Sequence, residues 1–377
     1  MTRKKSALVL IIALVIAVCA ILCWLVAASK RNTVAAHPGE GARSKKVVIG
    51  DANAARSGAT PTKPIENAAA LLRGTPRETI SPRLQRLLSG DPARGKISRD
   101  VINAFLDERG RSALSLLVAW QESGNDELLR EAAELHPDDP QVQIAMLSTE
   151  LSEEERMQWI ERFKKFAPEN ALSDYYAAVE FFQRKDVASA IAALRTGTGK
   201  SQYEDYMIDQ MQEREVLFRA AGLPEAEARI QAMFGTTMPF LRTLSKVRQE
   251  LPTEIAARLS AGDLRGAIDL GSMGMTMAAQ MKTGSSSHVI LNELVSMAIE
   301  RSMIESLGPA AADQLLAASS ADRLAEIARR RDEIRELTRT IDPAANNISP
   351  AQLTQYLQIM LDSGELQALQ WLKARRE

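Results

Sequence analysis

One short stretch of this sequence has the residue types of a phosphate-binding loop. In "RTGTGKSQY", Arg195–Tyr203, glycines precede a lysine and a serine. A phosphate-binding loop follows the pattern G-x-x-x-x-G-K-[ST] and lies between a buried strand and a helix. Counting back from Gly199, the first glycine of that pattern falls on Leu194, and the residues before it have helical character. We therefore expect Gly197 and Gly199 to end a helix, Ser201 to cap the next one, and no nucleotide to bind here.

The other residues with chemical potential are scattered or have simpler structural roles. The run Ser285–Ser287 precedes His288, but adjacent side chains diverge, and no strand-turn-helix elbow surrounds them. We expect a serine-capped helix start there. Neither His37 nor His136 has a second histidine at helical spacing. The sequence thus predicts no catalytic residue, no cofactor and no metal site, and we do not expect an enzyme.

A basic run near the carboxyl end, "ARRRDEIRELTR", holds several arginines. Glu326 and Arg330, like Arg329 and Glu333, stand four residues apart, which places opposite charges on one helix face. We expect a solvated face of ion pairs. A contact for an acidic partner is the alternative.

Composition limits the classes of function. The 377 residues include 47 Lys and Arg against 48 Asp and Glu, so the near-neutral charge argues against a nucleic-acid binder. Both cysteines, Cys19 and Cys23, lie in an apolar N-terminal segment. The rest of the chain therefore has no disulfide framework and no thiolate metal site.

That N-terminal segment predicts a membrane anchor. After the tail "MTRKK", residues 1–5, the run Ser6–Ser29 carries no charge and would extend about 36 Å as a helix, enough for a hydrocarbon core of about 30 Å. A cleaved secretion signal ending near Val26–Ala28 is the alternative. Arg3–Lys5 favour a cytoplasmic N-terminus, so we expect a single-pass protein of a bacterial-type inner membrane, with its body on the periplasmic side.

The chain beyond the anchor divides by composition. Residues 30–66 are rich in Ala, Gly, Pro, Ser and Lys and lack aromatic residues, which predicts a disordered linker. Residues 67–377 have apolar positions at three- and four-residue spacing without sustained alternation, which predicts an all-α body, with a candidate sub-boundary near 235. Helix starts are marked by Ser152 with Glu155, and by Ser81 and Ser349 before prolines.

One segment of the body resembles a tetratricopeptide (TPR) repeat. In "DYYAAVEFFQRKDVASAIAALRTG", Ala178 stands at the small position of the first helix, Lys185-Asp186 form the turn, and Ala190-Ile191 begin the second helix. "SAGDLRGAIDL" and "DSGELQALQWL" are similar to turn-plus-second-helix fragments of the same family. The resemblance implies an α-solenoid of helical hairpins, whose concave face binds extended peptides or partner helices.

These features together favour a membrane-anchored scaffold that binds a protein or peptide partner. We expect the partner surface around Tyr175, Tyr176 and Ala178, and on a methionine stripe of one helix, although such a stripe is also typical of a core. The stripe consists of Met273, Met277 and Met281. The alternative is an envelope assembly component that oligomerises through Asp322–Thr340 and Ala351–Arg376, and an unrecognised enzyme ranks third. The oligomeric state and the partner's identity are open at this point.

Overall fold

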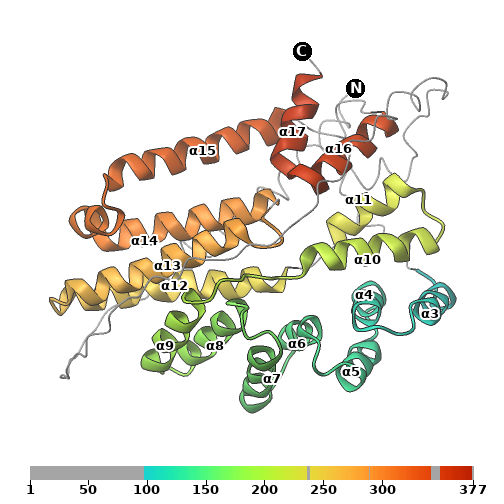
Figure 1. Ribbon diagram of the computed structural model, residues 1–377, viewed down its shortest axis with the longest axis horizontal. Helices are drawn as coiled ribbons and strands as arrows, with labels where there is room; N and C mark the ends of the chain where they lie inside the picture. The colour runs from blue at the N-terminus through green and yellow to red at the C-terminus, as the bar shows by residue number, and fades with distance from the viewer. Residues whose placement is uncertain (1–96, 236–237, 288, 341–348, 376–377) are drawn as a thin grey trace, which may run out of the picture. The chain divides into compact units, whose positions relative to one another are not determined.

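The computed structural model describes residues 97–235, 238–287, 289–340 and 349–375, all within one unit, Ile80–Glu377 (Figure 1). Within these ranges the chain is helical and has no β-strand, only an isolated parallel bridge between Asn170 and Gln202. The all-α prediction is confirmed for this part. The predicted tail, anchor and linker, and the helix start at Ser81, lie outside the described residues. Among the described helices, none is both long enough and apolar enough to span a bilayer.

The helices follow one another with short connections. In chain order they are α3 (Arg99–Glu108), α4 (Ala113–Ser123), α5 (Asp126–Leu135), α6 (Pro140–Leu147), α7 (Glu153–Phe166), α8 (Leu172–Gln183), α9 (Val187–Thr198), α10 (Met207–Ala220), α11 (Glu225–Gly235), α12 (Pro239–Ser260), α13 (Leu264–Thr283), α14 (Ile290–Leu316), α15 (Ser320–Thr340), α16 (Pro350–Ser363) and α17 (Glu365–Ala374).

Local capping chemistry sets several of these boundaries. The Ser152 hydroxyl accepts a hydrogen bond from the backbone N–H of Glu155, and the Glu155 carboxylate accepts one from the backbone N–H of Ser152. The predicted capping box therefore begins α7. Ser349 forms the same reciprocal pair with Gln352 at the start of α16. Gly124 ends α4 in the left-handed region, at φ 68°, which glycine adopts without steric cost. The predicted helix starts at Ser152 and Ser349 are confirmed.

Two prolines did not behave as simple helix ends. Pro252 lies inside α12, between Leu251 and Ile255, both fully buried against the rest of the core. Packing on both sides of the proline keeps the helix continuous despite the missing N–H. In α14, Gly308 adopts φ 72° and ψ 167° just before Pro309, so this helix is kinked there.

The helices form two layers, which Figure 1 shows as the blue-green row and the yellow-orange helices beside it. From α3 to α9, each helix packs on the next one in the chain. The chain then enters a second layer, in which α10 packs on α3 and α4, α12 packs on α6 and α8, and α13 packs on α9. Further out, α15 contacts α14 and α17, and α16 contacts α11. The second layer therefore covers α8, a helix that we expected to be open.

The core runs through both layers. Its largest cluster of buried apolar side chains extends from Ile144 to Leu372 and includes Ile230 and Phe240, on either side of the candidate sub-boundary. A second cluster fills the space between α3 and α6 and includes Leu217 of α10. The hydrophobic effect thus joins the early hairpins to the later helices.

The crossing of α13 and α14 depends on two glycines. A Cβ at Gly271 would lie 2.6 Å from Leu307 Cδ1, and a Cβ at Gly274 would collide with the side chain of Met303. Both neighbours belong to α14. Small residues at such positions allow helix backbones to approach closely, which explains the glycines in a helix interior where they otherwise cost stability.

Candidate functional site

The stretch that resembles a phosphate-binding loop forms the end of α9. Gly199 is the C-cap, as predicted, whereas Ser201 caps nothing, because α10 begins only after Tyr206. A Cβ at Gly197 would lie 3.0 Å from Tyr175 Cε1, so this glycine permits close packing of α9 on α8. The helix that precedes the lysine replaces the strand that phosphate binding requires.

The lysine of this stretch is occupied by the fold. Lys200 Nζ lies 2.5 Å from Asp174 Oδ2, and the two side chains are only 15% and 3% exposed. Asp174 Oδ1 also lies 3.7 Å from Lys164 Nζ, and Lys200 Nζ donates to the carbonyl oxygen of Asn170 at 3.4 Å. The ammonium group therefore neutralises a buried carboxylate between α8 and the end of α9.

The same stretch also joins the two layers. Gln280 of α13 accepts a hydrogen bond from the Tyr175 hydroxyl. Its own amide nitrogen donates to the carbonyl oxygens of Gly197 at 3.1 Å and Lys200 at 2.8 Å. Burial raises the pKa of Tyr175 well above its ordinary value, which keeps the hydroxyl protonated as a donor. These hydrogen bonds hold α13 against α8 and the end of α9.

The residues that we expected on a partner surface lie in the core. All six side chains are buried: Tyr175, Tyr176, Ala178, Met273, Met277 and Met281. The physical reason is the second layer, since α12 packs on α8, and α13 packs on α9, α12 and α14. The methionine stripe faces that interior as filler. These residues therefore do not form an exposed surface in the folded chain.

The predicted serine cap is replaced by two longer-range contacts. Ser286 and Ser285 donate to the buried Asp205, and Asn292 donates to the Ser286 carbonyl oxygen at 3.0 Å. Burial raises the pKa of Asp205. His288 lies outside the described residues, and His136 Nε2 lies 2.9 Å from the carbonyl oxygen of Arg111.

The start of α14 is capped from another helix. Its N-cap residue, Val289, supplies no side-chain hydrogen bond. Instead, Glu365 of α17 accepts the Ile290 N–H at 2.9 Å. Burial raises the pKa of the Glu365 carboxyl, and the Ile290 N–H only partly opposes this effect. The charged form therefore costs free energy in the folded chain.

This cap makes stability depend on pH. The pKa of Glu365 in the folded chain exceeds the ordinary carboxyl value of about 4.3. The contribution of Glu365 to the free energy of unfolding is therefore complete below that value, and it is lost as pH rises through the folded pKa. We expect Glu365→Gln, which keeps an acceptor, to abolish this decrease, and Glu365→Ala to cost about 1 kcal/mol through the lost cap. Urea unfolding of the wild type and of each variant, from below the ordinary carboxyl pKa up to neutral pH, checks both outcomes. A wild-type pH dependence that persists in Glu365→Gln would contradict the assignment.

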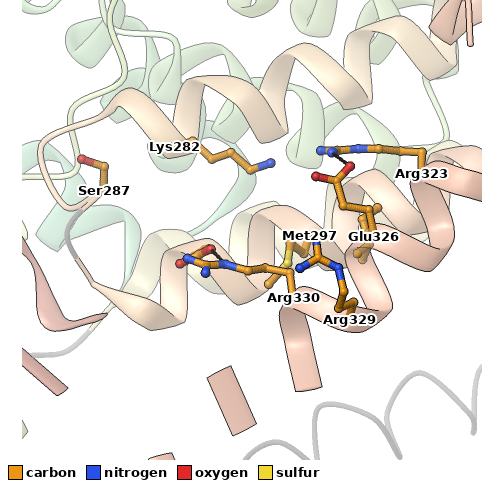
Figure 2. Close-up of a pocket in the computed structure, with 9 residues that line it drawn as sticks. Lys282, Ser287, Met297, Arg323, Glu326, Arg329 and Arg330 are labelled. Atoms are coloured by element: carbon orange, nitrogen blue, oxygen red, sulfur yellow. Dashed lines mark hydrogen bonds and ion pairs between the residues drawn. The ribbon is translucent and has the colours of Figure 1, made fainter. Parts of the chain in front are cut away.

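A pocket lies where α15 meets α13 and α14, and we call it the α15 pocket (Figure 2). Its volume is about 370 Å³. In Figure 2 the side chain of Lys282 extends toward the space that the arginines of α15 border. The lining residues are Lys282, Ser287, Glu293, Met297, Arg323, Glu326, Ile327, Arg329 and Arg330.

Every cation of the α15 pocket has a carboxylate partner. The pairs link α15 to α13 and α14 or lie within α15, and they are Lys282–Glu300 at 3.2 Å, Arg323–Glu300 at 2.5 Å, Arg330–Glu293 at 2.8 Å and Arg329–Glu333 at 2.6 Å. The predicted pair Arg329–Glu333 is confirmed. The predicted pair of Glu326 with Arg330 is absent among the described contacts, because Glu326 binds Arg323 instead. These ion pairs hold α15 against α14 and leave little uncompensated positive charge in the α15 pocket.

A different surface has unmatched positive charge, and the sequence analysis missed it. Arg242 and Lys246 lie one turn apart on α12, and neither makes an ion pair with any described residue. Arg156 of α7 lies close enough to Lys246 to lower its pKa, after the larger effects of burial and of Arg242. We call Arg156, Arg242 and Lys246 the α12 cationic surface. The sequence signal was available, since like charges four residues apart repel each other on a helix.

Within the described ranges, no group of three His, Cys, Asp or Glu side chains is arranged to hold a metal ion. Comparison of the chain with protein-family models, with curated proteins and with solved structures found no match.

Proposed function

We propose that this chain is a membrane-anchored scaffold that binds a protein partner through the surface of a TPR-like helical array. The anchor in this proposal is Ser6–Ser29, and residues 30–66 are the tether that holds the array away from the bilayer. The array belongs on the periplasmic side of the membrane, following the basic N-terminal flank.

The observation that carries the proposal is the packing of consecutive helices. Between α3 and α9, every helix contacts its successor, and α8 with α9 forms a hairpin whose turn is at Lys185 and Asp186. Lys185 adopts φ 60°, and Asp186 caps α9 by accepting the Ser189 N–H at 3.1 Å. Arrays of such hairpins offer large surfaces that suit protein recognition.

The way the chain uses its reactive side chains also supports binding. Lys200 and Asp174 neutralise each other, and Ser286 is bound to Asp205. Side chains that are used in this way hold segments of the fold together. What remains accessible is shape and charge on the helix surface, which is the means by which a scaffold recognises its partner.

In-cell chemical crosslinking of the full-length chain, followed by its purification from membranes and mass spectrometry, tests the proposal. We expect a heterologous protein crosslinked to the helical array, and retention of the chain in the membrane fraction after alkaline extraction. Loss of membrane retention when Ser6–Ser29 is deleted is the matched control.

Two results would contradict the proposal. Crosslinked species that contain only copies of this chain would favour an envelope assembly component, with contacts through α15 to α17. A chain that alkaline extraction releases from the membrane would remove the anchor from the account.

A further inference from the structure

We propose that the α12 cationic surface binds a carboxylate-rich segment of a partner protein. This inference deepens the proposed scaffold function and rests on it, because it names the chemistry of the partner and the place where the partner binds. The surface comprises Arg156 of α7 with Arg242 and Lys246 of α12.

The position of Arg156 is fixed by the fold. Its Nη1 donates to the carbonyl oxygen of Leu147 at 3.1 Å, and its Nε lies 3.5 Å from Glu180 Oε2. The same Glu180 carboxylate, only 4% exposed, also lies 3.2 Å from Arg184 Nη2. One buried carboxylate thus serves two guanidinium groups, so the charge of Arg156 is only partly compensated.

On α12 the positive charge is less compensated. Buried Leu244 and Val247 hold this helix in the core, where it packs on α6 and α8, and Lys246 is half-buried beside them. Arg242 is exposed. The carboxylates of Glu180 and Glu250 raise the pKa of Lys246, but each has a smaller effect than either of the two arginines.

The α15 pocket is the other basic site of the described chain, and it is less available to an incoming carboxylate than the α12 cationic surface. There, each lysine and arginine is already paired with a carboxylate, so an incoming anion would have to displace an existing partner. At Arg242 and Lys246 no described carboxylate forms an ion pair, and Glu180 and Glu250 only partly offset the charge of Lys246. An incoming carboxylate would also relieve the repulsion between these cations and Arg156, which is why the surface favours an acidic ligand.

The spacing of the two cations fits a peptide segment. Residues four apart on a helix are separated by about 6 Å along its axis. Alternate residues of an extended chain are separated by about 6.8 Å, so two carboxylates of one segment can reach both cations together.

Binding of a fluorescent polyglutamate peptide to the full-length protein in zwitterionic nanodiscs tests the inference. We expect Arg242→Gln with Lys246→Gln to weaken binding about tenfold, and Lys246→Arg to retain it, because charge is preserved. Arg265→Gln is the matched control, an exposed arginine near the other end of the α12–α13 hairpin, and Arg329→Gln tests the α15 pocket. Neither of these two changes should alter binding.

Several outcomes would overturn the inference. One is equal binding by wild type and by the double variant, and another is an equal loss in Arg265→Gln or Arg329→Gln. A third is displacement of the peptide by inorganic phosphate at the same total charge, which would indicate a free-anion site. Binding to phosphatidylserine vesicles that depends on Lys246, without binding of the peptide, would indicate a membrane contact instead.

The reactivity of Lys246 supplies a second readout. Burial, Arg242 and Arg156 lower its pKa against the opposing Glu180 and Glu250, so a larger fraction of its amine is unprotonated near neutral pH. We expect Lys246 to react with an amine reagent faster than exposed lysines, and polyglutamate to slow this reaction by raising the pKa. Labelling of Lys246 that is no faster than that of Lys373, or that is unaffected by the peptide, contradicts the surface.

The failure of this inference differs from failure of the scaffold proposal. If the peptide does not bind but a protein is crosslinked elsewhere on the array, only the α12 cationic surface is wrong. If the peptide binds as expected but no heterologous protein is crosslinked in cells, the scaffold function is wrong and the acidic-ligand chemistry of the surface stands.

Discussion

Replacement of Arg214 by alanine is expected to lower the free energy of unfolding by about 3–5 kcal/mol, since it leaves a buried carboxylate without its partner. Arg214 on α10 is 1% exposed, and its partner Glu122 on α4 is 5% exposed. Arg214 also donates to Gln121 Oε1 at 3.2 Å. These contacts join the second layer to the first, so their loss affects the whole fold. Urea unfolding followed by circular dichroism measures the change.

A double replacement separates the ion pair from simple packing. Glu122→Gln with Arg214→Met removes both charges and retains most of the volume, and we expect it to cost much less than Arg214→Ala, because no unpaired charge remains. Arg265→Ala, at an exposed position, should change stability by less than about 0.5 kcal/mol. If Arg214→Ala and Arg265→Ala lower the free energy of unfolding by the same amount, the buried pair does not stabilise the packing of the two layers.

Replacement of Lys200 by alanine is expected to destabilise the protein by about 2–3 kcal/mol, a little below the usual cost of breaking a buried pair. The effect is smaller than that at Arg214 because Lys200 is 15% exposed, and because Asp174 keeps Lys164 at 3.7 Å. Asp174→Asn in the Lys200→Ala background should restore part of the loss, since it removes the unpaired carboxylate. Thermal unfolding of the three proteins checks this order.

The same variant distinguishes structure from nucleotide chemistry. If Lys200 bound phosphate, Mg²⁺ and ATP would stabilise the wild type, and Lys200→Ala would abolish that shift while leaving the unliganded protein intact. We expect no such shift in either protein. A nucleotide-dependent stabilisation that disappears in Lys200→Ala would show that Gly197 to Ser201 serve a ligand.

Local chemistry allowed much of the helix pattern to be predicted. A serine followed three residues later by Glu, and a serine directly before a first-turn proline, both favour a helix start whatever the rest of the chain does, so Ser152 and Ser349 marked real starts. Gly124 follows α4 and Gly262 lies just beyond α12, both with positive φ, a backbone conformation that stops a helix locally. The kink at Gly308 was missed, and α14 continues beyond it to Leu316.

Long-range contacts could not be predicted from spacing. Ser286 looked like a cap because its partner Asp205 is 81 residues away in the sequence, and the actual cap of α14 comes from Glu365, 75 residues from Ile290. The tyrosines of α8 and the methionines of α13 have the spacing of one helix face. Whether such a face is open or covered depends on α12, whose placement on α8 is a tertiary contact.

The α12 cationic surface was also missed, although its residue types and spacing are plain in the sequence. Arg242 and Lys246 were visible in the sequence as two like charges one turn apart. Their significance appears only when α12 is placed beside Arg156 and when the arginines of α15 are found to be paired. Sequence gives the sign and spacing of charges, whereas the fold decides which of them remain uncompensated.

The most direct test is photo-crosslinking in native membranes, with a photoreactive amino acid in place of the exposed Gln249, one turn from Lys246 on α12, so that Arg242 and Lys246 stay in place. Position 265 is the control. We expect a crosslink from position 249, and not from position 265, to a Glu- and Asp-rich segment of a heterologous protein. Crosslinks from position 249 only to lipid or to a second copy of this chain would show that the α12 cationic surface does not bind such a partner.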